Sequence, residues 1–271
     1  MATANTLCVA LAGSVGNVSQ THPTPTSPST PSVPKEPPSE PPPPSPLDRA
    51  FLTNQPNAGQ LVLVRHGQQE WPSGPRMTPA DYVDPPLSER GRRQAQAVGA
   101  ALADEPIDAT YCSHLRRAHE TASAIAGAHQ GEPEVYPELR EVEVYRDLPE
   151  GMTVREAIRE PILRGVSERF VQERTWDVFP YSEPSAEFRH RIVTVIEGIL
   201  AGHVGANVVV VCHSGVINAY IAHVLGLRED MFFRAGHASV SRVVAGDGRR
   251  VVFTLNETHH LAAVDPALVT Y

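Results

Sequence analysis

Two short apolar runs, each leading into a histidine, are the strongest pattern in the chain. Gln60–Val64 (QLVLV) and Asn207–Val211 (NVVVV) are continuously apolar after their first residue, with no polar alternation. Such runs are typical of strands that are buried on both faces, as in a parallel sheet covered by helices. We therefore expect both segments to lie inside a sheet.

Segments with helical spacing of apolar residues separate these runs. The pattern indicates one or two helices over Thr153–Arg174, interrupted at Pro161 and Gly165. Further helices are predicted over Leu87–Ala103, Leu115–Ala128, Ser185–Leu200 and Val216–Leu225. Ser88 is a suitable N-cap for the first of these, because its hydroxyl can accept from a free backbone N–H.

The remaining apolar segments predict further strands. Asp108–Ser113 and Glu134–Leu139 are short strand candidates, and Ser239–Val244 with Arg250–Leu255 reads as a hairpin around a Gly-Asp-Gly turn. Strands that alternate with helices predict a largely parallel sheet. The fold class is therefore α/β, a three-layer sandwich with a mostly parallel central sheet and helices on both faces.

The N-terminal part of the chain has a different composition. Twelve of the 26 prolines lie between Pro23 and Pro46, interleaved with Ser, Thr and Glu. Such a stretch buries too little apolar surface to offset the entropy of ordering it. We predict a disordered tail over residues 1–58 and one domain over residues 59–271. A solvated spacer and a ligand for SH3 or WW domains are both open roles for the tail.

Charge and cysteine content exclude some classes of protein. A net charge of −8 argues against a nucleic-acid partner, which needs a dense basic surface. No Lys or Arg precedes Lys35, as a secretory signal would require, and the apolar segment Leu7–Gly13 is too short to span a membrane. The three cysteines have no CxxC spacing, which fits a reducing compartment. We expect a cytoplasmic protein with no membrane partner, and its oligomeric state stays open.

The candidate chemistry lies where the two apolar runs end. The first continues into Arg-His-Gly at 65–67, and the second, one residue later, into His-Ser-Gly at 213–215. In open α/β sheets, ligands bind beyond the carboxyl ends of the strands. Each glycine permits close approach of a ligand to the backbone, and the helix after Ser214 offers its N-terminus to an anion. This pattern favours an anion site, although two histidines that merely cap strands would give it too.

Five segments in order carry a resemblance to a known family. They are LVRHGQ at 63–68, DPPLSERG at 84–91, SHLRRA at 113–118, LRE at 139–141 and VVCHSGV at 210–216. Together they resemble the histidine phosphatase superfamily, in its phosphoglycerate-mutase-like branch. The resemblance covers nearly all of the chain from Leu61 to Leu261. A lone Arg-His-Gly is a weak signal, whereas five segments in the right order are a strong one.

The resemblance implies a role for each matching residue. His66 is the nucleophile, Arg65 and Arg117 clamp the phosphate, Glu141 is the proton donor, and His213 is a second phosphate-binding histidine. A neutral imidazole is a competent nucleophile, and arginine offers fixed donors to phosphoryl oxygens. A carboxylic acid serves as proton donor when its pKa is raised. No metal and no cofactor are required.

Further contacts to the phosphate are expected from Gln68, Ser214 and Gly215. Three alternatives stay open: Arg117 on a solvated helix face, or Glu138 or Glu143 in place of Glu141. Gln69 departs from the family, which usually has a small hydroxyl residue there. The His259-His260 pair is expected to border the site or to pack structurally.

The resulting hypothesis is a phosphomonoester hydrolase that forms a phosphohistidine and acts on a small phosphorylated metabolite. A mutase of the cofactor-dependent phosphoglycerate type is the first alternative, but segments 142–145 and 151–184 do not resemble its characteristic stretches. A non-catalytic interaction module is the second. Gly151–Tyr181 is predicted to form a helical cap over the site, with arginines and aromatic residues that either contact the substrate or lie on a solvated face.

Overall fold

Six strands form one sheet at the centre of the computed structural model, in the order β3-β2-β4-β1-β5-β6. The structure describes residues 44–53, 55, 57–71, 83–144, 146–152, 156 and 159–271, and most of the predicted tail lies outside them. The strands are β1 (Gly59–Arg65), β2 (Ala109–Cys112), β3 (Glu134–Val135), β4 (Val208–Cys212), β5 (Val240–Gly246) and β6 (Arg249–Glu257).

The four strands β3, β2, β4 and β1 run parallel, and the β5–β6 hairpin adds two antiparallel strands beside β1. The predicted mostly parallel sheet and its terminal hairpin are therefore confirmed. In the register of β1 and β4, Arg65 is opposite Cys212. The next residue of each strand, His66 and His213, consequently leaves the sheet at the same edge.

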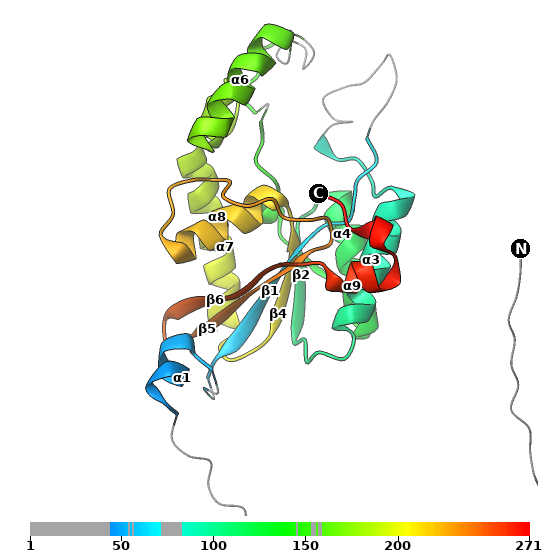
Figure 1. Cartoon of the computed structure of the whole chain (residues 1–271), viewed down its shortest axis with the longest axis vertical. Helices are drawn as coiled ribbons and strands as arrows, with labels where there is room; N and C mark the ends of the chain where they lie inside the picture. The colour runs from blue at the N-terminus through cyan, green and yellow to red at the C-terminus, as the bar shows by residue number, and fades with distance from the viewer. Residues whose placement is uncertain are drawn as a thin grey trace, which may run out of the picture. The chain divides into compact units, whose positions relative to one another are not determined.

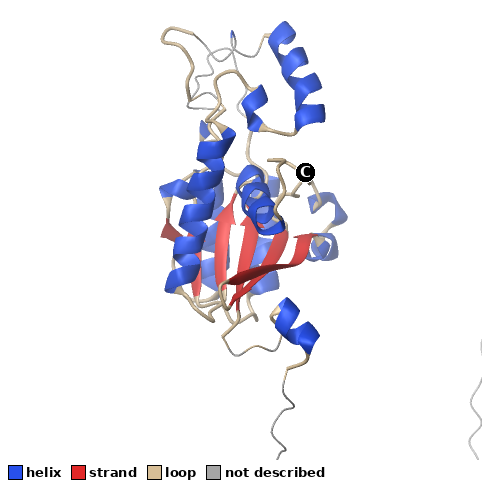
Figure 2. Cartoon of the chain, turned by 90° about the vertical axis from the view of Figure 1, so that its left-hand side faces the viewer, coloured by secondary structure: helices blue, strands red, loops and turns tan. Residues whose placement is uncertain are grey.

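Helices cover both faces of the sheet. One layer contains α3 (Glu89–Leu102), α4 (Arg116–Ala128) and α9 (His259–Val264), and the other contains α7 (Ser185–Gly202) and α8 (Ser214–Leu225), as Figures 1 and 2 show. Alternate residues of β1 pack into the two layers, Val62 and Val64 on the α3 and α4 side and Leu61 and Leu63 on the α7 and α8 side. All four are fully buried, and each such side chain contributes about 1.5–3 kcal/mol. The three-layer sandwich is confirmed.

The start of α3 lies directly behind the loop that follows β1. Ser88 caps this helix as predicted, with its Oγ accepting from Gly91 N at 3.0 Å. A Cβ at Gly91 would collide with the carbonyl of Gln68, and a Cβ at Gly67 would collide with Gly91. The two backbones therefore meet without side chains between them, which fixes the loop that carries His66.

The predicted cap contains α6 (Glu160–Glu173) and the short 3₁₀ helix η2 (Trp176–Val178). In Figure 1, α6 lies beyond the end of the sheet toward which β1 runs. The prediction of an interruption at Gly165 is wrong, because α6 continues through it, and Pro161 lies in the first turn, where its missing N–H costs no helical bond. Residues 153–155, 157 and 158 of the expected helix lie outside the described residues.

Part of the segment expected to be disordered is folded. Helix α1 (Pro46–Phe51) begins with a capping box in which Ser45 and Asp48 bond each other's backbone. Leu52, just after it, is buried, and the Arg249 guanidinium donates to the backbone carbonyls of α1. The abundance of proline hid this helix signal, so part of the segment predicted to be disordered forms a helix.

Two further differences concern short elements. The strand expected over Glu134–Leu139 is the two-residue β3 followed by a 3₁₀ helix, η1 (Pro137–Leu139), because its proline cannot donate to a sheet ladder. Another 3₁₀ helix, η3 (Pro266–Leu268), follows α9. Among the described residues, no helix has the length and apolar content needed to cross a membrane.

Candidate active site

His66 follows the last residue of β1 and is 4% exposed. Its Nδ1 lies 2.7 Å from the carbonyl oxygen of Gly67, to which it donates, and its Nε2 lies 3.2 Å from Arg117 Nε, from which it accepts. Burial lowers the pKa of His66 well below its usual value, and the positive charge of Arg117 lowers it further. The ring is therefore neutral, with the lone pair of Nε2 turned toward an arginine.

His213 lies beside His66, with 5.0 Å between the ring centroids. It is fully buried, and neither ring nitrogen has a hydrogen-bond partner within the part of the chain that the structure describes. Burial, followed by Arg117 and Arg65, lowers the pKa of His213 well below its usual value. An unsatisfied buried polar group costs about 1–3 kcal/mol, and such a group at the end of a strand is suited to a ligand oxygen.

Both predicted arginines lie at this edge. Arg117 is 7% exposed and donates from Nη1 to Val83 O at 2.9 Å, so its placement on a solvated helix face is ruled out. Arg65 donates to Ala235 O at 2.6 Å, while its Nε has no partner among the described residues. Burial lowers the pKa of Arg65 to about 10 and also lowers that of Arg117. Arg65 therefore remains charged at neutral pH.

Glu141 lies against the N-terminus of α8. Its Oε2 accepts from Gly215 N at 3.1 Å, and its Oε1 accepts from Val142 N at 3.1 Å. Burial raises the pKa of Glu141, although both backbone hydrogen bonds act in the opposite direction. Of the two alternatives, Glu138 is exposed, and the carboxylate of Glu143 pairs with Arg140 at 2.9 Å. The structure thus brings Glu141, rather than either neighbour, to the two arginines and two histidines.

The other residues predicted to contact phosphate differ in their surroundings. Gly215 lies at the site through its bond to Glu141, and Ser214 is the first residue of α8. The Gln68 side chain accepts from Ser88 Oγ at 3.3 Å, and its backbone N donates to Gln94 Oε1 at 2.7 Å, so both groups bond within the protein. Gln69 forms a β-bridge with Leu87.

Four residues that support the site were not assigned roles from the sequence. His237 Nε2 lies 3.0 Å from Arg65 Nη2, and its Nδ1 lies 2.9 Å from the hydroxyl of Thr270. Burial lowers the pKa of His237 to about 3, so it accepts from Arg65 as a neutral ring. Gln94 donates to Thr270 Oγ1 at 2.9 Å, and Thr121 accepts from Gly67 N at 3.1 Å. Gln94 and Thr121 each lie three residues after a matching motif, whereas no spacing pattern points to His237 or Thr270.

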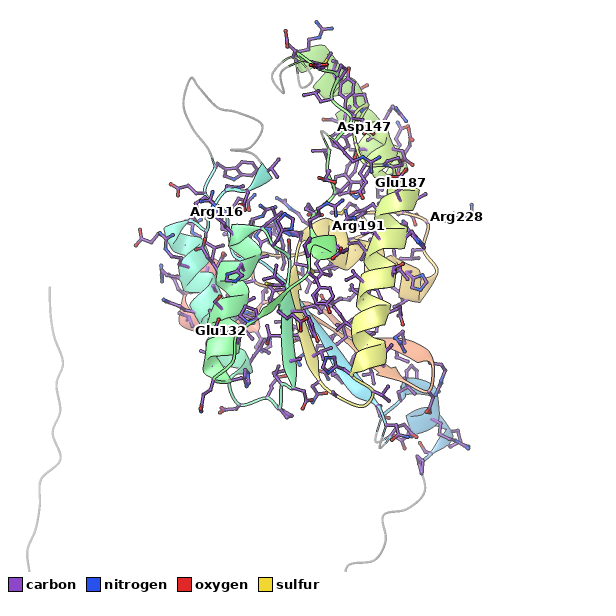
Figure 3. The ribbon with its side chains drawn as sticks, turned by 180° about the vertical axis from the view of Figure 1, so that it is seen from behind. Arg116, Glu132, Asp147, Glu187, Arg191 and Arg228 are labelled. Atoms are coloured by element: carbon purple, nitrogen blue, oxygen red, sulfur yellow. The ribbon has the colours of Figure 1, made fainter. Side chains whose placement is uncertain are left out.

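The segment before Glu141 is held by an ion pair. Arg191 of α7, labelled in Figure 3, donates from Nε and Nη2 to the carboxylate of Glu183 at 3.0 and 2.7 Å. Its Nη1 also donates to Arg140 O at 3.0 Å. The side chains of Glu183 and Arg191 are 3% and 13% exposed. This pair fixes the backbone that presents Glu141.

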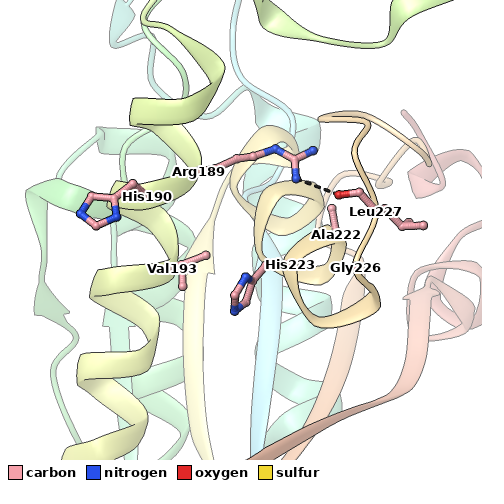
Figure 4. Close-up of a pocket in the computed structure, with 7 residues that line it drawn as sticks. All are labelled: Arg189, His190, Val193, Ala222, His223, Gly226 and Leu227. Atoms are coloured by element: carbon pink, nitrogen blue, oxygen red, sulfur yellow. Dashed lines mark hydrogen bonds between the residues drawn. The ribbon is translucent and has the colours of Figure 1, made fainter.

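A cavity of about 370 Å³ opens beside the proposed acid. Its lining residues are Val83, His114, Leu115, Arg117, Arg140, Glu141, Val142, Glu143, Val144, Arg146 and Trp176. A separate hollow of about 400 Å³ lies between α7 and α8 (Figure 4), and there Arg189 donates to Leu227 O at 3.0 Å. Since the cavity beside Glu141 includes Arg117, it is the space in which a substrate would meet the site.

The other histidines and cysteines do not form a metal site among the described residues. Within the described ranges, no group of three or more His, Cys, Asp and Glu side chains is arranged to hold a metal ion. His260 is buried, and its Nε2 lies 3.0 Å from Ala238 O, so its packing is structural. Cys112 and Cys212 are buried free thiols, and burial raises the pKa of Cys112 to about 12.

The fold and the site together define a class of protein: an α/β protein with two histidines, two arginines and a carboxyl group at the carboxyl edge of a mostly parallel sheet. The chain belongs to the histidine phosphatase superfamily, branch 1, whose family model matches residues 61–258. The resemblance inferred from the motifs is therefore confirmed.

Several relatives carry phosphatase names. Phosphoserine phosphatase 1 of Hydrogenobacter thermophilus is 33% identical over 204 residues, which cover 74% of this chain and 94% of that protein. The metal-independent phosphoserine phosphatase of Arabidopsis thaliana is 31% identical, with coverage of 76% and 84%. The structure of a mycobacterial glucosyl-3-phosphoglycerate phosphatase superimposes with a TM-score of 0.62 at 26% identity, covering 74% of this chain and 100% of that one. Proteins named as phosphoglycerate mutases are relatives too.

Proposed function

We propose that this protein is a phosphomonoesterase that needs no metal ion and acts on a small phosphorylated substrate through a phosphohistidine on His66. The observation that carries the proposal is the neutral His66 ring, whose Nε2 faces Arg117 Nε at 3.2 Å while Nδ1 is held by Gly67 O. Two relatives that are named phosphoserine phosphatases match this chain over most of their length, which supports the same activity.

In the first step, Nε2 of His66 attacks the phosphorus atom, the N–P bond forms, and the ester P–O bond breaks. The leaving alkoxide takes a proton from Glu141, whose raised pKa suits it to donate. Arg65, Arg117 and His213 would bind the equatorial oxygens, where the transition state carries its charge.

In the second step, a water molecule loses a proton to Glu141 and attacks the phosphorus atom. The N–P bond breaks, inorganic phosphate leaves, and both Glu141 and the neutral His66 return to their starting states. Because the ring keeps its Nδ1–H···O=C bond to Gly67 throughout, the tautomer is the same in both steps. The arginines supply the positive charge that stabilises the transferring phosphoryl group, so neither step uses a metal ion. A cytoplasmic location and a catalytic domain over residues 59–271 are parts of the proposal.

Transfer to a second hydroxyl instead of water would make the protein a mutase. That reaction requires exclusion of water from the phosphoenzyme. The segment 142–145 lacks the stretch that the mutases carry after the acid, and Val142 and Val144 line the open cavity instead. Hydrolysis is the outcome that this arrangement favours.

The direct test is phosphate release from p-nitrophenyl phosphate and a panel of phosphoesters, including phosphoserine and 3-phosphoglycerate, in the presence of EDTA. We expect turnover by the wild type and a loss of about a thousandfold or more in His66→Ala, because the nucleophile is removed. A rapid-quench experiment should trap an acid-labile phosphoenzyme in the wild type alone. Turnover abolished by EDTA, or unchanged in His66→Ala, would contradict the proposal.

A further inference from the structure

Trp176 stands in the wall of the cavity beside Glu141, at the start of η2. Its backbone N donates to the buried carboxylate of Asp230 at 2.9 Å, and Asp230 also accepts from Arg189 Nε at 2.6 Å. The indole ring packs against Phe170 and Phe179, with centroid distances of 5.5 and 5.9 Å. These contacts hold both the backbone and the ring in place, so the indole is a fixed part of the cavity.

The edge of the indole lies beside Gly215, the residue that binds the proposed acid. A Cβ at Gly215 would lie 3.4 Å from Trp176 Cζ2, and the N–H of Gly215 donates to Glu141. The neighbouring indole Nε1 is buried and has no hydrogen-bond partner among the described residues. A buried N–H without an acceptor is costly, and near a carboxyl that protonates a leaving group its natural acceptor is a substrate oxygen.

Most of the surface that lines the cavity is apolar, although charged residues contribute to it. Val83, Leu115, Val142 and Val144 line it together with the indole. Its arginines other than Arg117 already bind carboxylates of the chain, Arg140 with Glu143 and Arg146 with Asp147 and Glu187. Asp147 and Glu187 are labelled in Figure 3. His114, the remaining basic residue of the cavity lining, is exposed to solvent. A second anionic group on a substrate would compete with these ion pairs, whereas an apolar group meets matching walls.

We infer that this cavity binds the alcohol half of the substrate, and that Trp176 selects phosphomonoesters of a neutral, mainly apolar alcohol that carries a hydrogen-bond acceptor. The inference rests on the proposed function, since it assigns the leaving-group side of the same site. It ranks such esters above phosphoserine and 3-phosphoglycerate, whose alcohol halves are charged.

Isosteric substrate pairs test the indole donor. Butyl and 2-methoxyethyl phosphate, and pentyl and 3-methoxypropyl phosphate, differ by one ether oxygen in place of a methylene. We expect an ether to exceed its alkyl partner in kcat/KM by about three- to tenfold in the wild type, the size of one hydrogen bond. Trp176→Phe, which keeps a ring and removes the N–H, should abolish this difference. Trp71→Phe is the control, because Trp71 is 70% exposed and does not line the cavity.

A binding measurement separates this inference from the proposed function. In Trp71→Phe, Trp176 is the remaining tryptophan of the two in the chain, and its emission can be titrated with butylphosphonate or inorganic phosphate. We expect a saturable change with butylphosphonate and a weaker one with phosphate. If that response appears without hydrolysis of any ester, the cavity assignment stands and the proposed function falls. The inference is overturned if hydrolysis depends on His66 but Trp176→Phe keeps the preference for ethers and butylphosphonate leaves the emission of Trp176 unchanged. It is also overturned if phosphoserine is preferred over every neutral ester.

Discussion

The carboxylate of Glu141 lies against the backbone of Gly215, whose N–H donates to it at 3.1 Å. A Cβ at Gly215 would collide with Oε1 of the same carboxylate. Residue 215 is also in the first turn of α8, where free N–H groups and the helix dipole attract negative charge. At the scale of single residues, the site therefore depends on a missing side chain as much as on the side chains present.

Gly215→Ala should lower kcat by about tenfold or more, because the added methyl displaces the proposed proton donor, and a misplacement of about 1 Å can slow a reaction by about a hundredfold. The matched control is Gly198→Ala in α7, where a Cβ meets nothing within 4 Å. That change should leave kcat unaffected and stabilise the fold by about 0.5–1 kcal/mol. Steady-state kinetics and urea unfolding of both variants check this. Equal kcat values in the two variants would argue against the role of Glu141.

Glu141→Gln should slow the hydrolysis of alkyl phosphates by about a hundredfold or more, because an alkoxide needs the proton. With p-nitrophenyl phosphate, the rate of the first step should fall less, since nitrophenolate can leave without being protonated. With a raised pKa, Glu141 stays protonated to higher pH, so wild-type activity should fall as pH rises through that pKa. The lowered pKa of His66 places the acid limb well below pH 6.5. Single-turnover rates against pH measure both limbs, with Glu143→Gln as control.

At the scale of elements, helix α7 does more than cover the sheet. Its Arg191, which pairs with Glu183, donates to the carbonyl of Arg140, one residue before the proposed acid. Through Arg189 it binds Asp230, which in turn binds the backbone of Trp176. One helix thus positions both the acid and the wall of the cavity.

Glu183→Gln should destabilise the fold by about 3 kcal/mol, because it leaves a largely buried arginine without its counter-charge. It should also lower kcat more for alkyl than for aryl phosphates, because the displaced group is the proton donor. The control is Glu173→Gln in α6, whose ion pair with Arg169 is exposed and should leave stability unchanged. Urea unfolding and the two substrate classes give the readouts. A uniform loss on all substrates would indicate a purely structural role.

Local signals in the sequence were sufficient for the elements that carry the site. The runs in β1 and β4 are apolar at every position after the first because both of their faces are buried, and Ser88 caps α3 through its own hydroxyl. Gly165 misled the helix prediction, since one glycine costs only about 1 kcal/mol and the rest of α6 overrides it. Local spacing failed where contacts are long-range: His237 reaches Arg65, 172 residues earlier in the chain.

At the scale of the whole molecule, several histidines are buried in neutral form. Burial lowers the folded-state pKa of His66, His213 and His237 below the value of about 6.5 expected in the unfolded chain. The unfolded state therefore binds protons that the folded state does not, once the pH falls below about 6.5. The stability contributed by these residues is present above that pH and is lost below it.

The free energy of unfolding should accordingly fall between pH 7 and pH 5, by at most about 1.4 kcal/mol per pH unit for each such histidine. Urea titrations across this range measure the slope. His237→Gln should reduce the slope, and His119→Gln, on an exposed position, should not. The raised pKa of Glu141 acts in the opposite direction as pH falls toward about 4.5. A flat profile would show that the buried rings are protonated in the folded state.

The pairing of β1 with β4 also sets the order in which the protein can become active. These neighbouring strands are separated by most of the domain, since Gln60 and Asn207, which bond across them, are 147 positions apart. Closing so long a loop is entropically costly and comes after local structure has formed. His66 and His213 can meet only in the completed sheet, with α3, α4 and the residues of the cap emerging from the chain between them. Recovery of phosphatase activity during refolding would thus time the last stage of assembly, after helix formation is already visible.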